Sequence, residues 1–112
     1  MFSIIIFMIE MTAVELRKFI DENPKVTLID VRETWEYNVV SIENSIHIPI
    51  SEIQSRMNDF DEDQTIAFVC HHGIRSRMVG IYFEQNEFSK IINLRGGIDS
   101  WAKTVDSSMS IY

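Results

Sequence analysis

Short apolar segments alternate with amphipathic segments along most of the chain. Runs rich in apolar and β-branched residues predict buried strands at residues 26–31, 45–48, 65–69 and 90–94. Apolar positions three or four residues apart predict helices at residues 13–23, 33–40, 51–60, 75–86 and 98–105. Capping boxes that begin at Thr12 and Ser51 mark two of these helix starts. The alternation predicts an α/β fold, with a mainly parallel sheet covered by helices on both faces.

The first nine residues, MFSIIIFMI, are almost entirely apolar. They lack a basic region and a small-residue cleavage site, and they are far fewer than the roughly 20 apolar residues that a membrane span requires. We therefore expect no signal peptide or membrane anchor and predict a buried or edge strand from Ile4 to Glu10. In the alternative interpretation Met8 is the true start, and residues 1–7 are a non-essential extension of the single domain expected over residues 1–112.

Composition and charge narrow the classes of function. With 112 residues, 46% hydrophobic and 24% charged, the chain is long enough for one domain with its own core. Ten Lys and Arg against seventeen Asp and Glu give a net charge of −7, which argues against nucleic acid and anionic membranes as partners. Cys70 is the only cysteine, so no internal disulfide forms, and we expect a reducing compartment, the cytoplasm.

Polar chemistry gathers where two of the predicted strands end, the place where open α/β folds bind ligands. One end carries residues 30–33, and the other carries Cys70 to Ser76, which runs directly into a predicted helix. The amides of this loop and of the first helical turn are expected to converge on the sulfur of Cys70. Such amides stabilise a thiolate, a strong nucleophile, and equally a persulfide anion. The alternative for Cys70 is a buried structural cysteine.

Four segments in order resemble one known family. They are LIDVRE at residues 28–33 with Glu36 and Tyr37, IHIP at 46–49, CHHGIRS at 70–76, and NLRGGI at 93–98 followed by Trp101. Through these segments the chain resembles the rhodanese-like (sulfurtransferase) domain family, in its small single-domain bacterial type, from about Met8 to Tyr112. The resemblance implies a five-stranded parallel sheet wrapped by helices, with Cys70 as the residue that forms the persulfide.

The length of the loop distinguishes the chain from the related phosphatases. Four residues separate Cys70 from Arg75, whereas the phosphatase loops resemble Cys-x₅-Arg, and here Ser76 stands one position further on. The shorter ring suits a small sulfur species better than a tetrahedral phosphate. The chain departs from the family's pattern at Val40-Ser41-Ile42 and at Asn44-Ser45, where many members have Gly-His-Ile and Gly-Ala. Both departures lie in the connection before the third predicted strand, away from the loop.

The residues after Cys70 are predicted to form an anion-binding loop, with Ser76 in a supporting position. The residues whose amides are expected to serve the anion are His71, His72, Gly73, Ile74 and Arg75. We expect no metal ion here, because adjacent residues of one tight loop seldom point at one ion and no second cysteine is present. His71 and His72 are instead expected at the rim of a mildly polar pocket.

Arg75 has two interpretations, contact with the donor anion or bracing of the loop. We favour bracing, in which the guanidinium pairs with a carboxylate of the neighbouring strand end, with Asp30 and Glu33 as candidates. For Arg32 two alternatives remain open, contact with thiosulfate and pairing with Glu36. The aromatic residues expected in the core are Trp35, Tyr37 and Trp101.

The predicted function is a sulfurtransferase that works in two steps and needs no cofactor. Thiosulfate, or a persulfide donor, passes its outer sulfur to Cys70, and the resulting persulfide passes it to a thiol or protein acceptor, or to cyanide in vitro. One alternative is a non-catalytic binding or regulatory module, although such rhodanese-like modules commonly lack the cysteine. The other is a persulfide relay dedicated to one protein partner.

Overall fold

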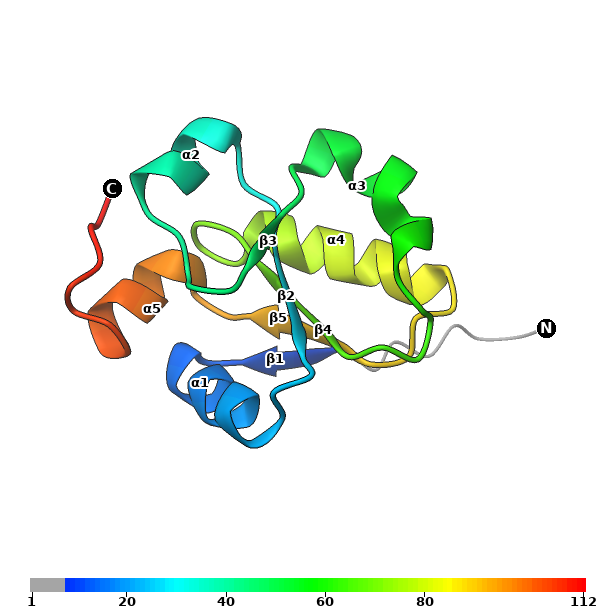
Figure 1. Ribbon diagram of the computed structural model, residues 1–112, viewed down its shortest axis with the longest axis horizontal. Helices are drawn as coiled ribbons and strands as arrows, with labels where there is room; N and C mark the ends of the chain where they lie inside the picture. Colours follow the sequence, from blue (N-terminus) through cyan, green and yellow to red (C-terminus); the bar gives the residue numbers. More distant parts are fainter. Residues whose placement is uncertain (1–7) are drawn as a thin grey trace.

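The computed structural model describes residues 8–112, which form a five-stranded sheet flanked by helices (Figure 1). The strand order is β1-β5-β4-β2-β3, and every pairing is parallel. The strands are β1 (Ile9–Met11), β2 (Thr27–Asp30), β3 (Ile46–His47), β4 (Ile66–Val69) and β5 (Ile91–Leu94). The predicted fold class is therefore confirmed.

Helices cover both faces of the sheet. They are α1 (Ala13–Glu22), α2 (Thr34–Val39), α3 (Ile50–Arg56) with the 3₁₀ turn η1 (Met57–Asp59), α4 (Ile74–Gln85) and α5 (Gly97–Thr104). Helices α1 and α5 lie on one face, and α3 and α4 lie on the other (Figure 1). None of these helices is long and apolar enough to cross a membrane.

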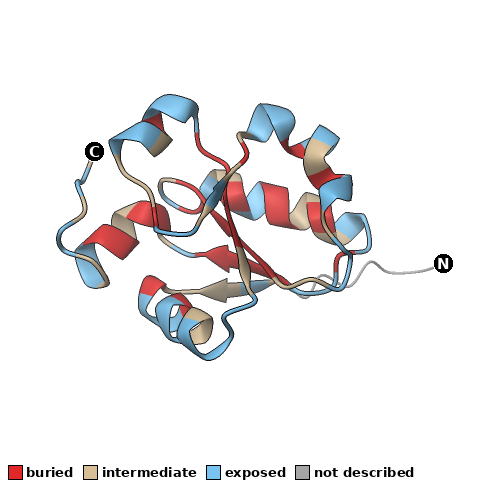
Figure 2. Ribbon diagram, viewed as in Figure 1, coloured by how far each residue is buried: buried red, intermediate tan, exposed pale blue. Residues whose placement is uncertain are grey.

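The central strand β4 is buried along its whole length, as Figure 2 shows for the middle of the sheet. Its residues alternate between the faces, because successive side chains of a strand point to opposite sides. Ile66 and Phe68 pack with residues of α3 and α4, whereas Ala67 and Val69 pack with residues of α1 and α5. Burial of a large apolar side chain contributes about 1.5–3 kcal/mol, so this two-sided core holds the end of β4 firmly in place.

One of the two predicted capping boxes is present and the other is wrong. Thr12 Oγ1 accepts from the N–H of Glu15 at 3.2 Å, and Glu15 Oε1 accepts from the N–H of Thr12 at 2.8 Å. In contrast, α3 begins at Ile50 with Pro49 as its N-cap and without a side-chain cap. Ser51 already lies inside the first turn, because proline takes the extended conformation that precedes the helix.

The N-terminal strand predicted from Ile4 to Glu10 is found only in part among the described residues. β1 spans Ile9–Met11 and lies at the edge of the sheet, where it pairs with β5. The predicted strand residues before Met8, and the proposed extension at residues 1–7, lie outside the described residues.

The connection before β3 contains a residue in the left-handed region. Asn44 adopts a φ of 67°, a conformation that glycine takes freely and that Asn tolerates better than most residues. The side chain of Ser45 also closes this turn, because its hydroxyl donates to the carbonyl of Ile42 at 2.6 Å. The connection thus forms a tight turn without the glycine that many resembling sequences carry there.

Candidate active site

The loop after β4 surrounds the sulfur of Cys70. Cys70 Sγ accepts hydrogen bonds from the N–H of Gly73 at 3.1 Å, from the N–H of Ser76 at 3.3 Å and from the Ser76 hydroxyl at 3.2 Å. Cys70 itself is only 1% exposed. Three donors directed at one buried sulfur complement a thiolate, which only accepts hydrogen bonds.

These donors match the predicted anion loop in part. The amide of Gly73 belongs to the predicted set, and Ser76, predicted as a supporting residue, contributes both its amide and its hydroxyl. Ile74 is 72% exposed, so its side chain lies outside the group of donors around the sulfur. That the remaining main-chain amides of the loop donate hydrogen bonds to the outer sulfur of a persulfide stays a prediction.

Two glycines allow the loop to pack tightly against the turn between β5 and α5. Gly73 adopts a φ of 96°, and a Cβ there would lie 3.0 Å from the carbonyl oxygen of Leu94. At Gly97 a Cβ would collide with the main-chain carbonyl groups of Cys70 and His71. The close approach lets the N–H of Ile98 donate to the carbonyl of Cys70 at 2.8 Å. The first turn of α5 therefore holds the main chain of the loop in place, a role that the sequence pattern did not predict.

Arg75 pairs with Glu36 in a two-pronged ion pair. Arg75 Nη1 lies 2.6 Å from Glu36 Oε1, and Arg75 Nη2 lies 2.9 Å from Glu36 Oε2. The hydrogen bonds from Arg75 lower the pKa of Glu36 from its ordinary 4.5 to about 2, against the opposing effect of burial. The same bonds raise the pKa of Arg75 above its ordinary value. Arg75 thus ties the start of α4 to α2.

Arg75 forms the predicted ion pair with a carboxylate, but the predicted partners, Asp30 and Glu33, are wrong. Glu33 is exposed at the N-cap of α2, and Glu36, one turn into the same helix, is the residue that faces inward. Asp30 is unavailable because it binds Arg32. The residue type was foreseen, whereas Glu36 lies in α2, outside the predicted segment at residues 30–33, and its inward position depends on the direction of α2.

Arg32 is a buried structural residue, so contact with thiosulfate is excluded in this arrangement. It is fully buried, and its Nη2 and Nε lie 2.7 and 2.9 Å from the Asp30 carboxylate. The alternative of a pair with the Glu36 carboxylate is also wrong, since Arg32 Nη1 reaches only the main-chain carbonyl of Glu36, at 3.3 Å. Burial alone would lower the pKa of Arg32, but the hydrogen bonds from Arg32 to Asp30 and Tyr112 outweigh it and raise that pKa. Asp30 therefore supports the site through Arg32.

Tyr112, in a tail without any recognisable sequence pattern, joins the same network. Its hydroxyl donates to Glu36 Oε2 at 2.8 Å and accepts from Arg32 Nη1 at 2.8 Å. Its ring stacks on that of His71 with centroids 4.0 Å apart. Burial raises the pKa of Tyr112, so the phenol stays protonated and able to donate at neutral pH. The tail thus lies beside the loop that holds Cys70.

Of the three aromatic residues predicted for the core, only Trp101 is fully buried. Trp101 is 2% exposed, whereas Trp35 is 62% exposed and meets Tyr112 edge-on at 5.8 Å. The prediction for Trp35 is wrong because Glu36, not Trp35, occupies the inward position of the short helix α2. Tyr37 is half-buried and stacks on His47 at 4.4 Å.

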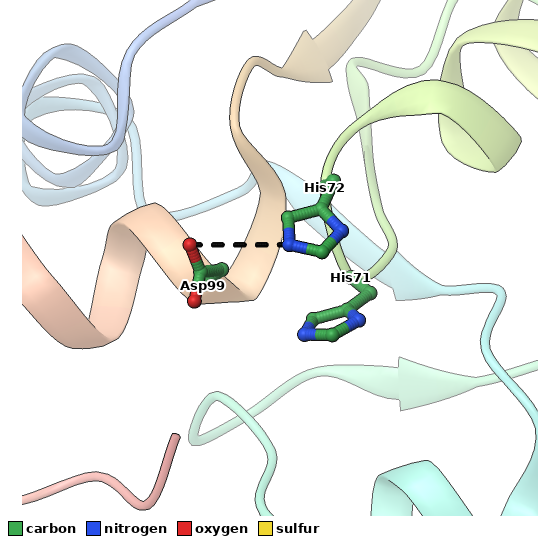
Figure 3. Close-up of side chains that lie close together, drawn as sticks. All are labelled: His71, His72 and Asp99. Carbon is green, nitrogen blue, oxygen red and sulfur yellow. Dashed lines mark ion pairs between the residues drawn. The ribbon is translucent and has the colours of Figure 1, made fainter. Parts of the chain in front are cut away.

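His71, His72 and Asp99 lie together beside the loop (Figure 3). One ligand-type atom from each lies within 4.8 Å of the others, so these are the described residues that come nearest to a metal-binding set. Two of the three already have partners, since Asp99 Oδ2 lies 2.9 Å from Lys103 Nζ and His71 Nε2 lies 2.9 Å from the main-chain oxygen of Tyr112. His72 Nε2 lies 4.0 Å from Asp99 Oδ2. The expectation of no metal ion stays a prediction.

A buried chain of polar side chains leads from the sulfur to the edge of the sheet. The Ser76 hydroxyl also lies within hydrogen-bond distance of Asn93 Oδ1, at 2.6 Å, and Asn93 Nδ2 donates to Glu10 Oε1 at 2.8 Å. Ser76 and Asn93 are 0% and 1% exposed. Sequence reasoning did not assign Asn93 or Glu10 to the site. A polar residue inside the apolar segment at residues 91–94 was the available signal.

The comparisons with known proteins agree with this geometry. A family model described as the rhodanese-like domain matches residues 12–104. YrkF of Bacillus subtilis, named as a sulfur carrier protein, is 32% identical over 92 residues, and the match covers 82% of this chain and 50% of YrkF. YtwF of the same organism, named as a sulfurtransferase, is 33% identical over 92 residues, and the match covers 82% of this chain and 88% of YtwF. The chain thus spans about half the length of one relative and most of the other.

A solved structure of a rhodanese-like domain protein from Staphylococcus aureus has the same fold. It is 30% identical, with a TM-score of 0.79, and the match covers 93% of this chain and 98% of that chain. A rhodanese-related protein from Thermoplasma volcanium is 34% identical, with a TM-score of 0.77 and coverage of 87% and 93%. The family model covers most of the chain and these structures share its fold, so the chain belongs to the rhodanese-like domain family.

Proposed function

We propose that this protein is a sulfurtransferase that carries sulfur as a persulfide on Cys70. The Cys70 thiolate attacks the outer sulfur of thiosulfate, a new Sγ–S bond forms, and the S–S bond of thiosulfate breaks. The electron pair of the broken bond leaves with sulfite. The persulfide then gives its outer sulfur to a thiol or protein acceptor, or to cyanide in vitro, and Cys70 returns to the thiolate. A low-molecular-weight persulfide serves as donor in the same way.

The observation that carries this proposal is the convergence of three hydrogen-bond donors on Cys70 Sγ. A thiolate is a nucleophile in its own right, so the first step needs no separate base. The guanidinium of Arg75 lies close enough to Cys70 for their charges to interact, even though Glu36 holds it in place. Oriented donors of this kind act at no cost of reorganisation when charge moves during the reaction.

The names of the relatives support the same class of reaction. One relative is named as a sulfurtransferase and another as a sulfur carrier protein. The second name favours a related function, in which the persulfide serves one dedicated protein acceptor and thiosulfate acts only as a surrogate donor. The net charge of −7 would suit a basic acceptor. The proposal includes a cytoplasmic location, no cofactor, and no nucleic acid or membrane partner.

Intact-mass measurement tests the proposal directly. After incubation with thiosulfate, the wild-type protein should gain the mass of one sulfur atom and lose it again with cyanide. Cys70→Ser and Cys70→Ala should show no gain and no thiosulfate:cyanide turnover, with unchanged circular dichroism. A sulfur adduct on the Cys70→Ala protein, or none on the wild type, would refute the assignment. Turnover that is slow with free thiols and fast with one protein thiol would select the dedicated relay.

A further inference from the structure

The Ser76 hydroxyl has one proton and two acceptors. Its Oγ lies 3.2 Å from Cys70 Sγ and 2.6 Å from Asn93 Oδ1, and a serine hydroxyl donates to only one acceptor at a time. We propose that Ser76 donates to Sγ in the free thiolate and to Asn93 in the persulfide. Asn93 is then a positioning residue for sulfur transfer. This inference rests on the proposed persulfide mechanism.

The orientation of the Asn93 amide follows from its other neighbours. Asn93 Nδ2 faces Glu10 Oε1 at 2.8 Å and the carbonyl oxygen of Gly73 at 3.1 Å. A carboxylate and a carbonyl only accept, so the NH₂ group must point at both of them. The Asn93 oxygen is consequently directed at Ser76. Glu10 is itself held near Arg77, whose Nε lies 3.5 Å from Glu10 Oε2.

The movement of charge during the reaction requires the second acceptor. In the free enzyme the negative charge is on Cys70 Sγ, where hydrogen bonds stabilise it. After attack on thiosulfate the charge is on the outer sulfur, and Sγ becomes a neutral, weak acceptor with two covalent bonds. Ser76 is fully buried, so a hydroxyl left without an acceptor would destabilise the persulfide state. Rotation of the hydroxyl toward Asn93 avoids this loss, and the reverse rotation accompanies sulfur delivery.

The proposal predicts opposite effects for two neighbouring residues on one equilibrium constant. The constant is that of thiolate plus thiosulfate going to persulfide plus sulfite. Ser76→Ala removes a donor that stabilises the thiolate and should raise this constant about tenfold. Asn93→Leu removes the acceptor used in the persulfide state and should lower it about tenfold. A purely structural role in loop packing would not produce changes of opposite sign.

The measurement uses mixtures of thiosulfate and sulfite in fixed ratios at pH 9, with the persulfide fraction read by intact mass. In the Ser76→Ala background, Asn93→Leu should change the constant by less than about twofold, because the two residues act through one hydroxyl. Glu10→Gln is the matched control. It keeps an oxygen that accepts from Asn93 Nδ2, so the Asn93 oxygen still faces Ser76 and the constant should stay close to that of the wild type.

Each outcome bears on a defined claim. The role of Asn93 would be overturned if Asn93→Leu left the equilibrium constant of persulfide formation unchanged. It would also be overturned if Asn93→Leu changed that constant equally in the wild type and in Ser76→Ala. If Asn93→Leu does not fold, the Ser76→Ala and Glu10→Gln variants decide: a constant that does not rise in the first, or that falls about tenfold in the second, overturns the role. A wild type that forms no adduct with thiosulfate or with glutathione persulfide would overturn the mechanism and this inference together.

Discussion

The ion pair between Glu36 and Arg75 should make the stability of the protein depend on pH in a specific way. Glu36→Gln removes the charge of the carboxylate and keeps only one of its two accepting oxygens, so an NH2 group comes to face donors. The part of its effect that changes with pH therefore reports the electrostatic contribution of the pair. Since Glu36 is only 4% exposed, this contribution is large for a single side chain.

The magnitude follows from the pKa of Glu36. That pKa falls from 4.5 to about 2 in the folded protein, and each pKa unit corresponds to about 1.4 kcal/mol, so the carboxylate stabilises the fold by about 3 kcal/mol. The Arg75 side chain is 36% exposed, and solvent screening of the partner reduces the expected value to about 2–3 kcal/mol. Because the folded pKa is lowered, the contribution is complete above pH 4.5 and is lost as the pH falls toward 2.

Urea unfolding followed by tryptophan fluorescence between pH 7 and pH 3 checks this prediction. Glu36→Gln should be less stable than the wild type by about 2–3 kcal/mol at pH 7, and about half of that difference should remain at pH 3. Glu33→Gln is the control, because Glu33 is exposed on the same segment and its loss should cost less than about 0.5 kcal/mol. A difference that stays constant over this pH range would show that packing, and not charge, explains the effect.

Three further predictions concern the loop. Arg75→Lys should lower both the melting temperature and the sulfurtransferase activity, because an ammonium cannot form the two-pronged pair with Glu36. An unchanged melting temperature together with a raised KM for thiosulfate would instead assign Arg75 to donor binding. Insertion of one glycine between Ile74 and Arg75 should weaken sulfur transfer, and a folded variant with full activity would show that loop size does not select the substrate. Alkylation of Cys70 by iodoacetamide at one fixed pH should be slower in Ser76→Ala than in the wild type, because the hydroxyl stabilises the thiolate; equal rates would contradict this.

Much of the architecture was readable from local patterns. The run at residues 65–69 has the apolar, β-branched character of a buried strand, and β4 is indeed buried throughout. Thr12 and Glu15 form the predicted capping box because both partners lie within one helical turn. The placement of Cys70 at the end of this strand followed in the same way, since it depends only on where the strand stops and the helix begins.

The partners inside the site were not readable in the same way. Residues 30–36 offer Asp30, Glu33 and Glu36 as carboxylates for Arg75, and sequence alone cannot rank them because the direction of each depends on how α2 packs. Tyr112 reaches the loop from a tail without periodicity, 41 residues beyond His71.

The sequence by itself thus determined the order of elements and the place of Cys70 at the end of β4, because hydrophobic period, capping and loop length act over a few residues. Only the tertiary structure decided which side chains serve the sulfur. Asn93 and Glu10 come from strands 83 residues apart and meet through the pairing of β1 with β5, a contact that no local pattern encodes. Buried polar groups must find partners wherever the packed chain provides them, and that choice is made across the sheet.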